Sequence, residues 1–231
     1  MSRIVLHGSR LSPFVEKAYR GLRYKGLDVE FVELGNPLEL RKLNPVTRKM
    51  PVALFDGERV YDSTFILRRA EELQPEPPFY AADAEVAANQ RRLEDWADES
   101  LYWMAMALRW TPKNAAATAS QILAGLPALL RPVVKPMVTR QIGGMARAQG
   151  FGRLPEDVLL RELGLALDDL ATSLGGRAFF WGERPGAADF AVYGQLHMLT
   201  SGPTPEAEAL IADRPPLVDF AKRVAEASGG A

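Results

Sequence analysis

The sequence predicts an α/β domain followed by an all-α domain, and three observations support this. Short apolar runs alternate with helical patterns through residues 1–76. Residues 74–83, QPEPPFYAAD, contain three prolines and are typical of a linker. Beyond the linker every long segment has helical spacing. We therefore expect a mixed domain over 1–76 and a helical domain over 84–231.

The first half of the α/β domain is predicted to run strand, helix, strand, helix. The apolar run RIVLHG (3–8) predicts a buried strand. Pro13 suits the first turn of a helix over 13–25, because that position needs no N–H. The alternating segment VEFVEL (29–34) predicts a second strand, and 37–44 a short helix.

The second half of this domain is predicted as a hairpin followed by a helix. Strands over 51–55 and 59–62 flank Asp56-Gly57, a dipeptide favoured in two-residue hairpin turns. Ser63 can then cap a helix over 63–74. The whole domain is expected to follow the order βαβαββα.

The helical domain is predicted from periodicity and from helix-ending residues. Pro155 suits a helix start, and Gly175-Gly176 a helix end. The expected helices cover 84–110 as one long helix, 115–148 with interruptions, 155–174, 187–200 and 215–227.

Composition excludes several classes of function. The formal net charge of −1 implies no field that attracts nucleic acid. The absence of cysteine excludes disulfides and a thiol nucleophile supplied by the chain, and two histidines make a metal site improbable. The most apolar stretch, 122–138, is interrupted by Arg131, Lys135 and three prolines, so no membrane span is expected. Since the N-terminus also lacks a signal-peptide pattern, we expect a cytoplasmic protein.

Three local features carry the chemistry. Ser12-Pro13 stands where a strand gives way to a helix, a junction at which the helix dipole can stabilise a thiolate. In NPVTRKMPVALF (44–55), Pro51 follows Met50 directly before a strand, where a cis bond is expected. Asp62 and Ser63 then place an acid and a hydroxyl at the start of a helix.

Together, SPF, NPVTRKMPV and DST resemble the N-terminal, thioredoxin-like domain of the cytosolic glutathione transferases, most of all serine-type members such as the plant tau class. The likeness covers roughly residues 1–75. ERPGAADFAVYGQL (183–196) is similar to a helix-starting segment of the family's C-terminal domain. The segments WADESLYW, AQGFGR and FFWGERPGAADF also resemble the metaxin-like and failed-axon-connections-like branch.

The resemblance implies a role for each matching residue. Ser12 would hydrogen-bond the glutathione sulfur, and Phe14 is assigned to the same site. Met50 would pair with the cysteinyl unit through its backbone, with Pro51 in the cis form. The remaining glutathione contacts would be Asp62 to the γ-glutamyl ammonium, Ser63 to its carboxylate, and Lys49 (or Arg48) to the glycyl carboxylate.

The sequence departs from the family pattern at two places. The family usually has Glu where Asp62 stands, and Ser or Thr where Gly186 stands, three residues before Asp189. Glycine is tolerated as an N-cap at a cost of a few tenths of a kcal/mol, so neither departure excludes the resemblance.

Simpler interpretations stand beside these roles. Ser12 and the Asp62-Ser63 pair can act as helix caps only, and Arg48 and Lys49 as solvated loop charges. Trp96, Trp103 and Trp110 recur every seven residues, on what is predicted to be one helix face that packs against the neighbouring domain or helix. Alternatively, Tyr102, Trp103 and Met106 line an apolar substrate pocket. The basic stretch 131–153 is a solvated segment, or contacts a membrane surface or an acidic partner.

The leading hypothesis is a homodimeric enzyme that uses the glutathione thiolate on a small hydrophobic electrophile, with glutathione as co-substrate and no metal. The alternative is a non-catalytic, metaxin-like binding or scaffold protein. A third hypothesis is a ligandin that stores apolar compounds between the domains. The retained set of Ser12, Pro51 and Asp62-Ser63 favours the enzyme.

Overall fold

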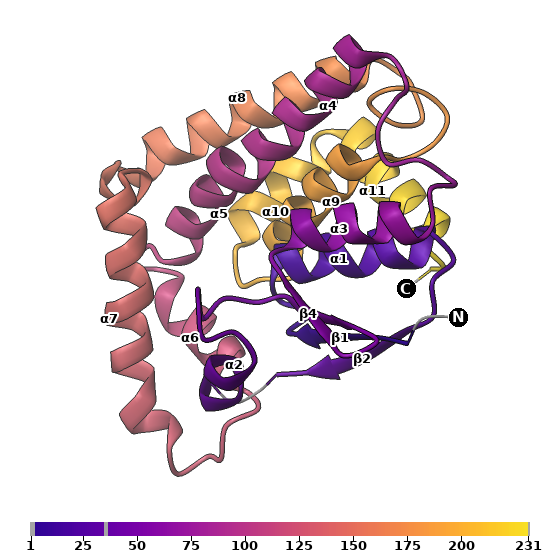
Figure 1. Cartoon of the computed structure of the whole chain (residues 1–231). Coiled ribbons are helices and arrows are strands. Elements are labelled where there is room, and N and C mark those ends of the chain that lie inside the picture. Colours follow the sequence, from indigo (N-terminus) through magenta and orange to yellow (C-terminus); the bar gives the residue numbers. More distant parts are fainter. Residues whose placement is uncertain (1–2, 35–36, 231) are drawn as a thin grey trace.

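The computed structural model of the chain describes residues 3–34 and 37–230 (Figure 1). Its N-terminal domain follows the predicted order βαβαββα. The elements are β1 (Ile4–Gly8), α1 (Pro13–Tyr24), β2 (Val29–Glu33), α2 (Pro37–Leu43), β3 (Val52–Phe55), β4 (Glu58–Tyr61) and α3 (Ser63–Leu73).

The four strands form one mixed sheet in the order β2-β1-β3-β4. β1 pairs in parallel with β2 and antiparallel with β3, and β3 pairs antiparallel with β4. Asp56 and Gly57 have φ angles of 49° and 92°, as a two-residue turn with left-handed residues requires. This sheet and its helices are the thioredoxin-like arrangement expected from the sequence.

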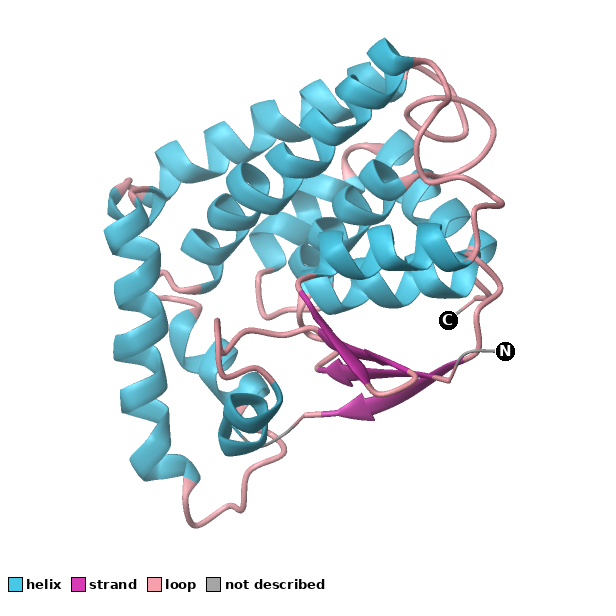
Figure 2. Ribbon diagram, viewed as in Figure 1, coloured by secondary structure: helices cyan, strands magenta, loops and turns pink. Residues whose placement is uncertain are grey.

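One face of the sheet is covered by α1 and α3, which lie side by side above it (Figures 1 and 2). The strands alternate, so Ile4 and Leu6 of β1 point into this layer and are fully buried. Leu22 of α1 and Leu67 of α3 meet them in the main hydrophobic core.

The second domain is all-helical. It consists of α4 (Ala84–Trp96), a π-helical segment η1 (Ala97–Leu101), α5 (Tyr102–Arg109), α6 (Ala115–Ile122), α7 (Arg131–Gln149), a 3₁₀ turn η2 (Phe151–Arg153), α8 (Glu156–Leu174), α9 (Ala187–Thr200), α10 (Pro205–Ala212) and α11 (Pro215–Ala227). Helix α7 stands at the left edge of the molecule in Figure 1, away from α1 and α3.

Helix α9 joins the two domains into one core. It is buried along almost its whole length, and its most extensive packing is against α1. A Cβ on Gly194 would lie 2.4 Å from the carbonyl oxygen of Pro13, so only glycine lets these helices approach so closely.

Two predictions about the helices are wrong. The single helix expected over 84–110 is divided by the π-helical segment, which changes the angular spacing of the residues on either side of it. Trp96 packs on the main core and Trp110 on a small separate cluster with Ala119, so the tryptophans do not share one packing surface. Helix α10 was not expected, because prolines and glycine crowd its N-terminal end.

No helix among the described residues combines the length and the apolar character that crossing a bilayer needs.

Candidate functional site

Three segments converge at one edge of the sheet because of the strand register. His7 near the end of β1 pairs with Val52 at the start of β3, and Val52 pairs with Tyr61 at the end of β4. The chain therefore leaves or enters all three strands at the same edge. These segments carry Ser12, Met50-Pro51 and Asp62-Ser63, which the structure brings to one place.

Ser12 occupies the N-cap position of α1 without using its side chain as a cap. Its backbone is extended (φ −88°, ψ 125°), its side chain is half-buried, and its hydroxyl makes no capping hydrogen bond to the first turn. Its carbonyl accepts hydrogen bonds from the N–H groups of Val15 and Glu16. The hydroxyl thus stands at the positive end of a 12-residue helix, where an anion is stabilised.

The loop before β3 ends in a cis Met50–Pro51 bond, as predicted. Pro51 is buried and Met50 half-buried, whereas Lys49 and Arg48 are exposed. The side chains of Lys49 and Arg48 therefore reach solvent at the rim of this edge.

Asn44 holds that loop in shape and was missed by the sequence reasoning. Its fully buried amide donates hydrogen bonds to Thr47 Oγ1 at 2.7 Å and to the carbonyl of Lys49 at 2.9 Å. Its Oδ1 accepts from the N–H of Thr47 at 2.9 Å. The signal was the Asn-Pro pair that opens the loop, since asparagine often hydrogen-bonds backbone in turns.

Asp62 caps α3 and adopts a rare backbone conformation. Its Oδ1 accepts from the N–H of Thr64 at 2.9 Å, and its φ of 73° with ψ of 138° is outside the regions that L-residues favour. Such outliers cluster at ligand-binding sites. Asp62 is exposed, while the neighbouring Ser63 is buried at 1% exposure.

Aromatic side chains from both domains meet beside Ser12. The ring of Phe14 lies 4.8 Å from that of Tyr102, and Tyr102 lies 5.1 Å from Trp103, measured between centroids. Burial, together with the charge of Glu99, raises the pKa of Tyr102 to about 12. Met106, one turn further along α5, packs on the main core and on Trp110. The three predicted pocket residues therefore lie on the helix that faces the start of α1.

A buried cluster of charged side chains contacts Thr64, the residue that follows Asp62-Ser63. The ammonium of Lys17, fully buried on α1, contacts Glu94 at 2.7 Å and Asp98 at 2.5 Å, and donates to Thr64 Oγ1 at 2.8 Å. Glu94 also accepts from the Tyr80 hydroxyl at 2.6 Å. This cluster ties α1 and α3 of the first domain to α4 and η1 of the second.

The two carboxyl groups in this cluster differ in their environment. Burial opposes ionisation of Glu94, but Lys17 and the hydroxyl donors lower its pKa. Burial raises the pKa of Asp98 to about 6 against the attraction of Lys17, with the charges of Glu94 and Asp62 adding to the rise. Asp98 Oδ1 is buried and has no hydrogen-bond partner among the described residues.

A cavity of about 450 Å³ opens beside this cluster, lined among others by Thr64, Arg68, Arg91 and Asp98. Thr64, which follows Ser63 in the first turn of α3, is one of the residues that line this cavity. Ser12 and Met50 do not line this cavity.

His7 lies on β1 next to this edge. Both of its ring nitrogens are buried without a hydrogen-bond partner in the described part of the chain, and burial lowers its pKa although Glu30 opposes the shift. A neutral imidazole is the form that this environment favours.

Comparison with known proteins gives two family matches. Residues 6–78 match the glutathione S-transferase N-terminal domain, and residues 164–224 match the glutathione S-transferase C-terminal domain. Together these segments make up more than half of the chain.

The curated relatives agree with this. A glutathione transferase of Zea mays (GST 23) is 33% identical over 133 residues, which are 53% of this chain and 59% of the relative. A probable glutathione transferase of Aplysia californica is 33% identical over 85 residues, which are 36% of this chain and 91% of the relative. The alignments span 59%, 42% and 37% of the length of the first three plant relatives, which is less than two thirds in each case.

Solved structures show the same fold. Rice GST1, crystallised in complex with glutathione, has a TM-score of 0.65 at 23% identity, covering 96% of this chain and 86% of its own. A tau-class glutathione S-transferase of mango (Mangifera indica) has a TM-score of 0.62 at 23% identity, covering 96% and 88%. None of the relatives described here is metaxin-like.

Proposed function

The chain belongs to the glutathione S-transferase family, and from this premise we propose that it activates the glutathione thiol for attack on a small hydrophobic electrophile. The observation that carries the proposal is the convergence of Ser12, Met50-Pro51 and Asp62-Ser63 at one sheet edge. The glutathione-bound rice relative of the same fold supports it.

Ser12 supplies the activation. A free thiol has a pKa of about 8.5, so only a few per cent is thiolate at neutral pH. The Ser12 hydroxyl is not used as a cap and can donate a hydrogen bond to the sulfur, at the N-terminal end of α1. A hydrogen bond to a charged partner is worth about 1.5–3 kcal/mol, which together with the helix dipole lowers the thiol pKa by about 1–2 units.

The other residues bind and orient glutathione. The backbone of Met50 pairs with the cysteinyl unit as an added strand would, held by cis-Pro51 and the Asn44-supported loop. Asp62 and Ser63 bind the γ-glutamyl ammonium and carboxylate, and Lys49 the glycyl carboxylate. Because Asp62 Oδ1 already accepts from Thr64, its other oxygen serves the ammonium.

The electrophile binds against Tyr102, Trp103 and Met106, next to the Phe14 ring of the glutathione site. These apolar side chains come from both domains and exclude water from the sulfur. The thiolate forms a bond to the electrophilic carbon while the leaving group departs with its electron pair, or an activated double bond accepts the pair and then a proton. We further propose a homodimer in the cytoplasm.

The test is a calorimetric titration of the protein with glutathione, followed by a spectrophotometric panel of electrophiles. We expect one glutathione per chain and turnover of at least one electrophile. Binding without turnover of any electrophile would favour a ligandin, and absence of binding would favour the scaffold hypothesis.

A further inference from the structure

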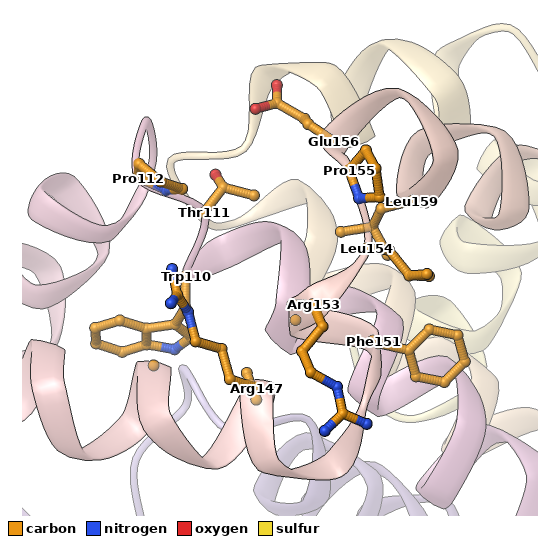
Figure 3. A pocket seen from close by; sticks show the side chains of 14 residues that line it. Trp110, Thr111, Pro112, Arg147, Phe151, Arg153, Leu154, Pro155, Glu156 and Leu159 are labelled. Carbon is orange, nitrogen blue, oxygen red and sulfur yellow. The ribbon is translucent and has the colours of Figure 1, made fainter.

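A second cavity, of about 440 Å³, opens between helices of the second domain (Figure 3). Its walls come from the end of α5, the C-terminal half of α7, η2 and the start of α8. The apolar part of the lining includes Trp110, Phe151 and Leu154, and the charged part includes Arg147 and Arg153. In Figure 3 the side chains of Arg147 and Arg153 extend in different directions from the wall formed by α7 and η2. Small-molecule sites commonly have this size and this mixture of apolar walls with a few polar groups.

This cavity is separate from the candidate glutathione site. All of its lining residues fall within 107–159, so no residue of the thioredoxin-like domain contributes. The two segments that match the family end at residue 78 and begin again at residue 164. The cavity is therefore built from a part of the chain that neither family match covers.

The segment GFGR (150–153) shapes one wall. Gly150 has a φ of 130°, which turns the chain sharply at the end of α7. A Cβ on Gly152 would lie 2.7 Å from the backbone of Ala146, so η2 packs directly on α7 with no room for a side chain. The wall that carries Arg153 is therefore fixed by close backbone contact.

The stretch of chain that builds most of the cavity carries only basic charged residues. Between Glu99 and Glu156 the sequence has no acidic residue. Its basic residues are Arg109, Lys113, Arg131, Lys135, Arg140, Arg147 and Arg153. The first four are engaged, in hydrogen bonds with backbone carbonyls or side chains or in the ion pair of Lys113 with Glu206.

The last three cations are unpaired. The side chains of Arg140, Arg147 and Arg153 make no hydrogen bond or ion pair with any described residue. Two of them line the cavity, and only Glu156 supplies a negative charge to its lining. Guanidinium groups bind carboxylates with paired hydrogen bonds, and indoles stack on flat rings.

We infer that this cavity binds an aromatic carboxylate, with the carboxylate attracted by the positive charge of Arg147 and Arg153 and the ring packed against Trp110 and Leu154. The site fits a molecule with one anionic end and one flat apolar end. Its occupation does not require glutathione, so the inference stands or falls independently of the proposed transferase activity.

The test uses 2-naphthoate as probe and isothermal titration of the full chain without glutathione. We expect one bound probe per chain, and at least ten-fold weaker binding of the neutral analogue 2-naphthalenemethanol, because it lacks the charge-assisted hydrogen bonds. The double variant Arg147→Gln/Arg153→Gln should weaken naphthoate binding by at least ten-fold. Both side chains are exposed and unpaired, so the variant should keep the melting temperature of the parent.

A matched control separates this site from general charge attraction. Arg140→Gln/Arg161→Gln removes the same number of charges from exposed positions outside the cavity, and should change the dissociation constant less than two-fold. Saturating glutathione should also leave naphthoate binding unchanged. The inference is overturned if naphthoate does not bind, if both double variants lose affinity equally, if neither does, or if glutathione displaces the probe.

Discussion

At the scale of single residues, Ser12 and Asp62 are assigned different tasks at the same sheet edge. The Ser12 hydroxyl makes no capping hydrogen bond to α1. Asp62, in contrast, caps α3 through its side chain and is exposed to solvent. The first is proposed to act on the sulfur and the second on the γ-glutamyl end. These tasks predict different kinetic signatures.

Ser12→Ala should leave glutathione binding nearly intact and raise the apparent pKa of the bound thiol. The loss of a hydrogen bond worth about 1.5–3 kcal/mol predicts a rate about ten- to hundred-fold lower at neutral pH. The measurement is a pH–rate profile with an electrophile that the parent accepts. Ser9→Ala serves as control, and an unchanged profile for Ser12→Ala would move the activating role to Ser9 or His7.

Asp62→Asn should weaken glutathione binding at every pH by about ten-fold, because it removes the charge that faces the ammonium. Asparagine keeps an acceptor for the Thr64 N–H and tolerates a positive φ, so the cap and the fold should survive. Ser63→Ala should have a similar effect on binding. Calorimetric titration at two pH values checks this, and an altered thiol pKa with unchanged affinity would contradict the assignment.

At the scale of elements, the start of α9 shows how tertiary contact replaces a local cap. Asp189 accepts hydrogen bonds from the N–H groups of Gly186 and Phe180, at 2.8 and 3.0 Å. The N–H of Ala187 donates to the carbonyl of Phe79 in the linker at 3.2 Å. The linker thus supplies an acceptor to a helix end that has no hydroxyl at its N-cap.

Gly186→Ser should therefore destabilise the protein, although Ser is usual at this position in the family. Its Cβ would lie 2.4 Å from the carbonyl oxygen of Phe79, which is backbone and cannot move aside. We expect a loss of about 1–3 kcal/mol in the free energy of unfolding, measured by urea denaturation.

Gly144→Ser is the matched control, because a Cβ there meets nothing within 4 Å. It should be neutral or slightly stabilising, since glycine is a poor helix former. If Gly186→Ser raised stability, a restored hydroxyl cap would outweigh the contact with the linker.

At the scale of the whole molecule, the two domains are joined by a buried cluster with an excess negative charge. One ammonium, Lys17, faces two carboxyl groups, and Glu94 receives most of the hydrogen bonds. When the cluster takes up a proton at acidic pH, the proton therefore goes to Asp98, whose pKa burial raises to about 6 from an ordinary value of 3.8.

Stability should depend on pH through Asp98. The folded chain holds this proton more tightly than the unfolded chain, so the contribution of Asp98 to the free energy of unfolding falls as pH rises from about 4 to 6, by up to about 3 kcal/mol. Asp98→Asn cannot titrate, so its stability relative to the parent should increase over this range. Urea denaturation of both proteins at about pH 4, 5 and 6, which span the interval between the two pKa values of Asp98, measures the difference. A difference that stays constant with pH would show that Asp98 does not hold this proton.

The sequence by itself determined the local structure of the first domain and indicated the residues proposed for the candidate site, apart from Asn44. Strand alternation, the helix start at Pro13 and the turn at Asp56-Gly57 each depend on a few neighbouring residues. The order βαβαββα and the hairpin could therefore be predicted from them, and the end of α8 could be predicted from Gly175. The domain limits 1–76 and 84–231 stay predictions, and they include residues 1–2 and 231, which lie outside the described chain.

Only the tertiary structure decided how distant segments meet. The register of three strands brings Ser12, Met50-Pro51 and Asp62-Ser63 to one edge, and Lys17 reaches Asp98 across 81 positions. The π-helical segment, the linker contact at Gly186 and the arginine-lined cavity equally depend on packing partners far away in the chain. Local pattern reports a residue's own backbone preference and polarity, whereas burial and pairing depend on what the folded chain places against it.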